Sequence, residues 1–99
     1  MIQFLIQYAV KPELADEQEA AINSFIEAIK GVGDPEASYT SLKAEDGVSF
    51  THIARFRTED ALKRFQSQPH FETFSKGLKP RCTDGPNAIK LSLVATTDG

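Results

Sequence analysis

The pair Asp46-Gly47 stands between two segments in which apolar and polar residues alternate, and it restricts the possible folds more than any other feature of the sequence. Asp-Gly between such segments is a strong signal for a β-hairpin, because tight hairpin turns need residues that tolerate a positive φ. We therefore predict a hairpin over residues 36–57 with a two-residue loop. This loop sets a register that pairs Glu45 with Val48, Lys43 with Phe50, Ser41 with His52, Tyr39 with Ala54 and Ala37 with Phe56.

The periodicity of the remaining sequence predicts two further strands and two helical regions. Alternation indicates a strand, and apolar residues at helical spacing indicate a helix. Residues 83–87, Thr-Asp-Gly-Pro-Asn, are typical of a loop. The predicted elements are a strand over 2–10, a helix from the acidic residues after Pro12 to Lys30, the hairpin, a helix over 59–66 capped by Thr58, a helical segment from Pro69 to Pro80, and a strand over 88–96.

The order strand, helix, strand, strand, helix, strand predicts an α+β fold. This fold is a ferredoxin-like βαββαβ sandwich, in which a four-stranded antiparallel sheet carries its helices on one face. We expect a single domain of this kind over residues 1–99. The face under the helices is predicted to hold Ile2, Phe4, Ile6, Tyr8 and Val10, with Ala37, Tyr39, Ser41, Phe50, His52, Ala54 and Phe56.

The opposite face of the predicted sheet mixes apolar and polar side chains. It is expected to hold Gln3, Leu5, Gln7, Ala9, Leu42, Thr51, Ile53, Arg55, Lys90 and Val94, while Ile89, Leu91, Leu93 and Ala95 share the other side of the last strand. A face this apolar is unfavourable in water, and a second copy of the chain is the simplest cover. We therefore predict a homodimer whose sheets meet face to face.

Composition and charge argue against several classes of function. The net charge is −3 and no block of Lys or Arg occurs, so nucleic-acid binding is not expected. No apolar run approaches the roughly 18 residues of a membrane span, so no membrane partner is expected. Cys82 is the one cysteine and cannot form an internal disulfide, which favours a cytoplasmic location. Neither histidine has a second ligand at metal-binding spacing, so no metal and no other cofactor is predicted.

Several short motifs occur in a recognisable order along the chain. They are Tyr-Ala-Val-Lys-Pro-Glu at 8–13, a strand that ends in the aromatic Phe56, a Thr-Glu-Asp-Ala-Leu helix start at 58–62, and Ser-Gln-Pro-His-Phe at 67–71. With these motifs the chain resembles the antibiotic-biosynthesis monooxygenase (ABM) family of dimeric α/β-barrel proteins. The resemblance implies a dimer with a pocket in each subunit between sheet and helices. It also implies cofactor-free oxygenation of phenolic or quinol-type aromatics as one activity of the family, with haem degradation as another.

Two positions depart from the family pattern. Family oxygenases and haem degraders often carry tryptophan where Phe56 stands, and this chain has no tryptophan. The haem-degrading members place a histidine in the last helix, where this chain has Phe74, Ser75 and Lys76. The resemblance therefore does not extend to haem binding.

His52 is the strongest candidate for a catalytic residue. The register places it beside Ser41 on the helix-facing side, and an imidazole with a pKa of about 6.5 can accept a proton at neutral pH. The same histidine could instead be inert, buried and hydrogen-bonded to Ser41. His70 follows Pro69 at a helix start and is interpreted as a structural or pocket-rim residue. The predicted lining of the pocket consists of Tyr8, Tyr39, Ser41, Phe56, His70 and Phe74.

The sequence therefore supports two functions. The first is a cofactor-independent monooxygenase-like protein that binds a small apolar, aromatic or quinol-type molecule, with His52 as base or orienting group. The second is a non-catalytic dimeric binding or structural domain of the same fold. A pocket needs apolar walls and a few convergent polar groups, and Tyr39, Ser41 and His52 supply such groups in either case. The residues identify no particular substrate.

Overall fold

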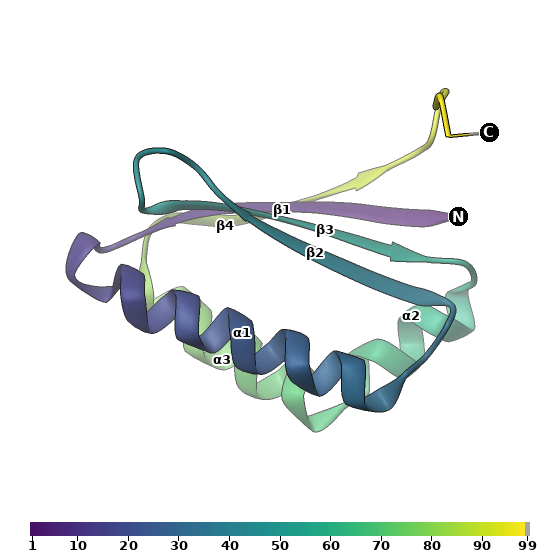
Figure 1. Cartoon of the computed structure of the whole chain (residues 1–99), viewed down its shortest axis with the longest axis horizontal. Coiled ribbons are helices and arrows are strands. Elements are labelled where there is room, and N and C mark those ends of the chain that lie inside the picture. Colours follow the sequence, from purple (N-terminus) through teal and green to yellow (C-terminus); the bar gives the residue numbers. More distant parts are fainter. Residues whose placement is uncertain (99) are drawn as a thin grey trace.

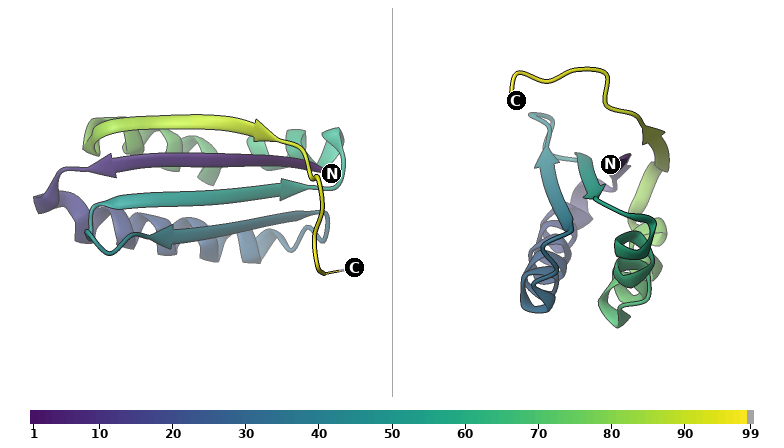
Figure 2. Two further views of the ribbon diagram at one scale, coloured as in Figure 1. Left: turned by 90° about the horizontal axis from the view of Figure 1, so that it is seen from above. Right: turned by 90° about the vertical axis from the view of Figure 1, so that its right-hand side faces the viewer.

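The computed structural model describes residues 1–98. One antiparallel sheet with strand order β2-β3-β1-β4 carries the α-helices on one face (Figure 1). Seen from above, α1 runs behind the β2 side of the sheet and α3 behind the β4 side (Figure 2). The elements are β1 (Ile2–Val10), the 3-10 turn η1 (Pro12–Leu14), α1 (Ala15–Val32), β2 (Ala37–Lys43), β3 (Ser49–Phe56), α2 (Glu59–Gln66), α3 (Pro69–Arg81) and β4 (Cys82–Leu91). This arrangement confirms the predicted ferredoxin-like fold.

The β2–β3 hairpin has the predicted register but a wider turn. Ser41 pairs with His52 and Tyr39 with Ala54, as expected. The predicted pairing of Glu45 with Val48 is wrong, because the last ladder bond runs from the Ala44 amide to the Ser49 carbonyl at 2.9 Å. The Asp46 carboxylate accepts the amides of Val48 and Ser49 at 2.9 Å each, which stabilises the wider loop. Both loop lengths give the same register, so the facing of every strand residue is unchanged.

Strand β4 differs from its prediction at both ends. It begins at Cys82, inside the segment predicted as a loop, and ends at Leu91. Gly85 makes this possible. Its φ is +79°, and a Cβ atom at this position would lie 2.8 Å from the Gln7 carbonyl oxygen, so only glycine fits here. The pairing register with β1 shifts next to this point, between Gln7 and Ala9. The turn-like composition therefore marks an irregularity within the strand.

The faces of β4 are also the reverse of the predicted ones. Ile89 pairs with Leu5 and Leu91 with Gln3, so both side chains lie on the outer face of the sheet. Lys90 pairs with Phe4 and belongs to the inner face. Val94 lies beyond the strand and is 98% exposed. The strand ends near Leu91 because its partner β1 begins at Ile2 and offers no further residues to pair.

The helices begin and end close to their predicted limits. The Thr58 hydroxyl accepts the Ala61 amide at 3.0 Å and caps α2 as predicted. Gly33, with a φ of +68°, ends α1. Pro80 lies inside the last turn of α3, so the predicted helix end is one residue too early. No helix in the described part of the chain is both long and apolar enough to cross a membrane.

The core lies between the inner face of the sheet and the helices. Most of the β1 and β3 side chains that the alternation placed inward are buried there, and the partly buried Ile2, Phe4 and Ile6 pack against them, which confirms the predicted facing of β1 and β3. The buried sheet residues are Tyr8, Val10, Phe50, His52, Ala54 and Phe56, and the helices add Ile22, Phe25, Ala61, Phe65 and Leu78. Gln18 of α1 is the other buried polar residue besides His52 within residues 1–98.

Candidate functional site

A cavity of about 330 Å³ lies between the inner face of the sheet and helices α2 and α3. Its wall is mainly aromatic, with Phe25, Tyr39, Phe56, Phe65, Phe71 and Phe74 among its lining residues. Ala54 and Ala88 leave room beside these rings, because each presents only a methyl group to the space. Phe25 and Phe74 stack with their ring centroids 4.4 Å apart, which holds α1 and α3 together at the cavity. The cavity suits a flat apolar molecule.

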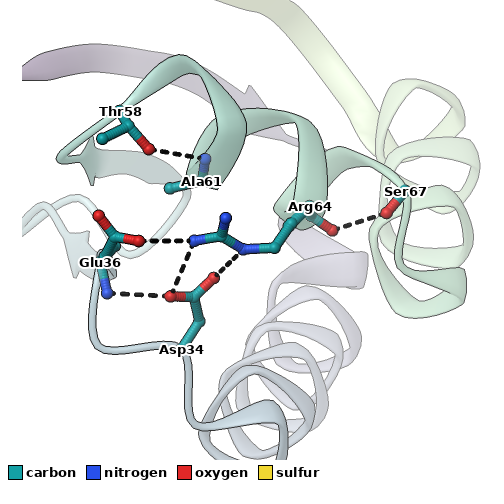
Figure 3. Close-up of polar contacts among 6 residues, drawn as sticks. All are labelled: Asp34, Glu36, Thr58, Ala61, Arg64 and Ser67. Carbon is teal, nitrogen blue, oxygen red and sulfur yellow. Dashed lines mark hydrogen bonds and ion pairs between the residues drawn. The ribbon is translucent and has the colours of Figure 1, made fainter.

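Helix α2 forms one side of the cavity and is tied to the segment between α1 and β2. Arg64 donates to both carboxylate oxygens of Asp34, at 2.8 and 3.3 Å, and to Glu36 at 3.0 Å (Figure 3). The hydrogen bond from Arg64 lowers the pKa of the Asp34 carboxyl group, and the Glu36 amide adds to this effect. These contacts position α2 so that Leu62, Phe65 and Gln66 face the cavity.

The cavity wall holds few polar groups. Within residues 1–98 the polar side chains that line it are those of Tyr39, Gln66 and Ser75, and no charged side chain is among them. Burial raises the pKa of the Tyr39 hydroxyl above its ordinary value of 10.0, with a smaller contribution from Tyr8. Tyr39 is therefore protonated at neutral pH and can donate a hydrogen bond to an oxygen atom of a ligand.

A buried polar cluster lies next to the cavity. The two ring nitrogens of His52 are both engaged, Nε2 with the Tyr8 hydroxyl and Nδ1 with the Ser41 hydroxyl, each at 2.6 Å. The amide of Gln18 donates to the Tyr8 oxygen at 2.8 Å. Burial lowers the pKa of His52 from 6.5 to about 4, so the ring is neutral at pH 7. Burial likewise raises the pKa of Tyr8 above 10.0.

Comparison with known proteins identifies the family. The family model described as antibiotic biosynthesis monooxygenase matches residues 1–77. The chain belongs to the ABM family. A comparison with curated proteins gave no match.

Solved structures share this ABM fold over nearly the whole chain. One, described as an antibiotic biosynthesis monooxygenase, has a TM-score of 0.82 and 18% identity, covering 96% of this chain and 100% of its own. Rv0793 from Mycobacterium tuberculosis has a TM-score of 0.83 and 15% identity, with 97% of both chains covered. A mutant of SnoaB, a cofactor-independent oxygenase from Streptomyces nogalater, has a TM-score of 0.77 and 21% identity, covering 99% of this chain and 97% of its own. At these identities the likeness shows the fold alone.

The structure divides the predicted site residues of this ABM protein into three groups. Tyr39, Phe56 and Phe74 line the cavity. Tyr8, Ser41 and His52 form the polar cluster; the His52 ring lies 5.4 Å from the Tyr39 ring and 5.9 Å from the Phe74 ring, measured between centroids. His70 borders a separate hollow of about 60 Å³ beside Arg64, and its ring lies 5.8 Å from that of Phe25.

Sequence reasoning missed Gln18. Its position carried a readable signal, because Gln18, Ile22, Phe25 and Ile29 follow one another at helical spacing along the apolar stripe of α1. A polar residue on such a stripe must find a hydrogen-bond partner inside the protein. Gln66 and Ser75 were missed as well, and nothing in their spacing distinguishes them from surface residues.

Proposed function

We propose that this ABM protein is a cofactor-independent monooxygenase that oxidises a small, electron-rich aromatic molecule of the phenol or quinol type. The substrate binds in the cavity between the sheet and helices α2 and α3. The observation that carries the proposal is the wall of this cavity, which is rich in aromatic side chains and includes Tyr39. Family membership and the shared fold with SnoaB, a cofactor-independent oxygenase, support the proposal.

For this reaction the protein needs mainly to bind and orient the substrate. Aromatic walls hold a flat ring by stacked and edge-on contacts. A hydrogen bond from Tyr39 to a ring oxygen stabilises the negative charge that develops when the substrate loses a proton. The electron-rich anion then reacts with O₂ directly, and in the net reaction the ring CH₂ group of the substrate's keto tautomer and O₂ give a ring C=O group and water.

His52 acts in this proposal as an orienting group. Both ring nitrogens are already hydrogen-bonded, and its lowered pKa makes it a weak base at neutral pH. Its ring contacts the rings of Tyr39 and Phe74, which line the cavity. His52 therefore fixes the wall against which the substrate lies, and the proton acceptor is a water molecule or a group of the substrate itself.

Oxygen uptake with anthrone as the probe tests the proposal. Ala88 lines the cavity and is exposed, so Ala88→Leu fills the space without disturbing the core and should reduce the rate of oxygen uptake at least about tenfold. Tyr39→Phe should lower kcat by roughly 10²-fold, because it removes one hydrogen-bond donor to the oxygen on which negative charge develops. Ala44→Leu, in the exposed hairpin loop, is the matched control and should leave the rate unchanged. Uptake no faster than in buffer, or equal rates in all variants, would refute the proposal.

A second function, non-catalytic binding of the same class of molecule, is favoured by one observation. Among the described residues, no histidine, cysteine or charged side chain lines the cavity. No group in its wall is therefore suited to be a general base at neutral pH. Calorimetric titration with anthraquinone, which cannot be oxidised further, distinguishes the two. Tight binding that Ala88→Leu abolishes, combined with no oxygen uptake from anthrone, identifies a binding protein.

The predicted homodimer remains part of the proposal, with a more apolar interface than the sequence suggested. The outer sheet face exposes Leu42 and Ile89 at 52% each and Leu91 at 40%. Residues 92–98 continue on this side of the sheet, away from the helices (Figures 1 and 2). Light scattering should find a dimer in the wild type and a monomer in Ile89→Lys. Ser24→Lys on the exposed surface of α1 is the control and should remain dimeric. A monomeric wild type would refute this part.

A further inference from the structure

One continuous chain of hydrogen bonds crosses the interior, from a half-buried arginine to a groove on the other side of α1. Its members are Arg81, Gln18, Tyr8, His52 and Ser41, joined by contacts of 3.1, 2.8, 2.6 and 2.6 Å. Gln18 and His52 are fully buried, so water cannot substitute for these contacts. Ser41 borders the groove between α1 and β2, which has a volume of about 350 Å³.

The direction of the first two bonds follows from the chemistry of arginine. A guanidinium group only donates hydrogen bonds, so the Gln18 atom that faces Arg81 at 3.1 Å must be the carbonyl oxygen Oε1. The Gln18 nitrogen Nε2 therefore faces Tyr8, and the Tyr8 oxygen accepts a hydrogen bond from it at 2.8 Å. Arg81 is itself held by Glu17, to which it donates at 3.1 Å.

The Tyr8 hydroxyl then determines which His52 nitrogen carries the proton. Tyr8 has one proton to donate, and Gln18 approaches it with an N–H group that cannot accept it. His52 Nε2, 2.6 Å away, is the remaining partner among the described residues. Nε2 must therefore be unprotonated, and a neutral imidazole with a bare Nε2 carries its proton on Nδ1. That proton points at the Ser41 oxygen, 2.6 Å away.

We infer that Arg81 is a positioning residue that fixes His52 in the Nδ1–H form through Gln18 and Tyr8, and that Ser41 is consequently a hydrogen-bond donor to the groove between α1 and β2. A serine 2.6 Å from a histidine ring nitrogen otherwise matches the geometry of an activated nucleophile. Here the polarity is opposite. His52 donates a hydrogen bond to the Ser41 oxygen and cannot remove the Ser41 proton, so the Ser41 hydroxyl proton is left for an acceptor in the groove. The polar cluster has this arrangement whether or not a substrate is oxidised in the cavity.

Long-range proton–nitrogen NMR spectra of the ¹⁵N-labelled full chain at pH 7 test the inference directly. The spectra separate protonated from bare ring nitrogens, and Nε2 is recognised because it couples strongly to both ring carbon-bound protons. We expect the wild type to show His52 with a protonated Nδ1 and a bare Nε2. Substitution His70→Gln identifies which of the two ring patterns belongs to His52. A protonated Nε2 in the wild type, or labelling of Ser41 by a fluorophosphonate, would overturn the inference.

A near-isosteric substitution should reverse the chain. In Gln18→Glu the new carboxylate is kept ionised by Arg81. It can accept a hydrogen bond from Tyr8 but cannot donate one. Tyr8 then donates to it and accepts from Nε2–H, so the His52 proton moves from Nδ1 to Nε2. Arg81→Met frees the Gln18 amide to rotate and should give nitrogen shifts intermediate between the two forms. Glu17→Gln changes the other partner of Arg81 and should leave the wild-type pattern. An unchanged His52 pattern in folded Arg81→Met would overturn the role of Arg81, and an unchanged pattern in folded Gln18→Glu would overturn the role of Gln18.

Discussion

Burial of His52 should make the protein lose stability in mild acid, and the size of the loss can be worked out. The pKa of His52 is about 4 in the folded chain and 6.5 for a free imidazole. The unfolded chain therefore binds this proton first as the pH falls. Stability is fully present above pH 6.5 and declines as the pH falls towards 4. With about 1.4 kcal/mol for each pKa unit, the loss approaches about 3 kcal/mol. The cluster around the ring, Tyr8 and Ser41, holds no carboxylate that could compensate the charge.

Urea unfolding followed by circular dichroism, at one protein concentration and several pH values between 7 and 4, measures this loss. His52→Gln removes the titrating group and should flatten the free energy of unfolding over that range, relative to the wild type. His70→Gln is the control, because it removes the other histidine and should keep the wild-type slope. The surface carboxylates titrate in all three proteins and cancel in the comparison. Parallel curves for the wild type and His52→Gln would refute the reasoning.

Four further predictions concern two glycines of the backbone, a helix cap and the cysteine. Gly85→Ala should destabilise the protein by about 2 kcal/mol or more in urea unfolding, because of the positive φ and the close approach to Gln7. Gly31→Ala, in a helical turn with nothing within 4 Å of the new methyl group, should instead stabilise it by up to about 1 kcal/mol, and a loss there would contradict the reasoning. Thr58→Ala should cost about 1 kcal/mol in the same assay, and no change would show that the cap bond is not formed in solution. Burial raises the pKa of the Cys82 thiol, so iodoacetamide at pH 8 should modify it more slowly than free cysteine; a faster reaction would contradict this.

The hairpin shows how far local sequence signals reach. Asp46-Gly47 and the alternation on either side were sufficient to place His52 opposite Ser41 on the buried face. The width of the turn was not predictable from the dipeptide alone, because it depends on the Asp46 carboxylate accepting two backbone amides. The error was harmless, since adding one residue to each side of a loop preserves the register.

Strand β4 shows where such signals fail. Thr83 to Asn87 have the composition of a loop, and only the neighbouring backbone of β1 shows that Gly85 accommodates an irregularity there. The alternation of Ile89 and Leu91 was recognised, but alternation alone does not say which set faces the helices. Partners far away in the sequence decide this, as they decide the cavity, whose size depends on how α2 and α3 sit over the sheet. It could be predicted that Phe71 and Phe74 share the apolar face of α3, whereas the empty space between them and β3 could not.

Neighbouring residues of β4 lie on opposite faces of the sheet. Ala88 borders the cavity, and Ile89 points out from the other face. β4 is an edge strand, held in the sheet by β1 alone. A ligand in the cavity that displaced this strand would therefore also move the side chains on the outer face. Thermodynamic linkage makes the influence mutual, so occupancy of the interior and self-association would change each other's equilibrium constants by the same factor.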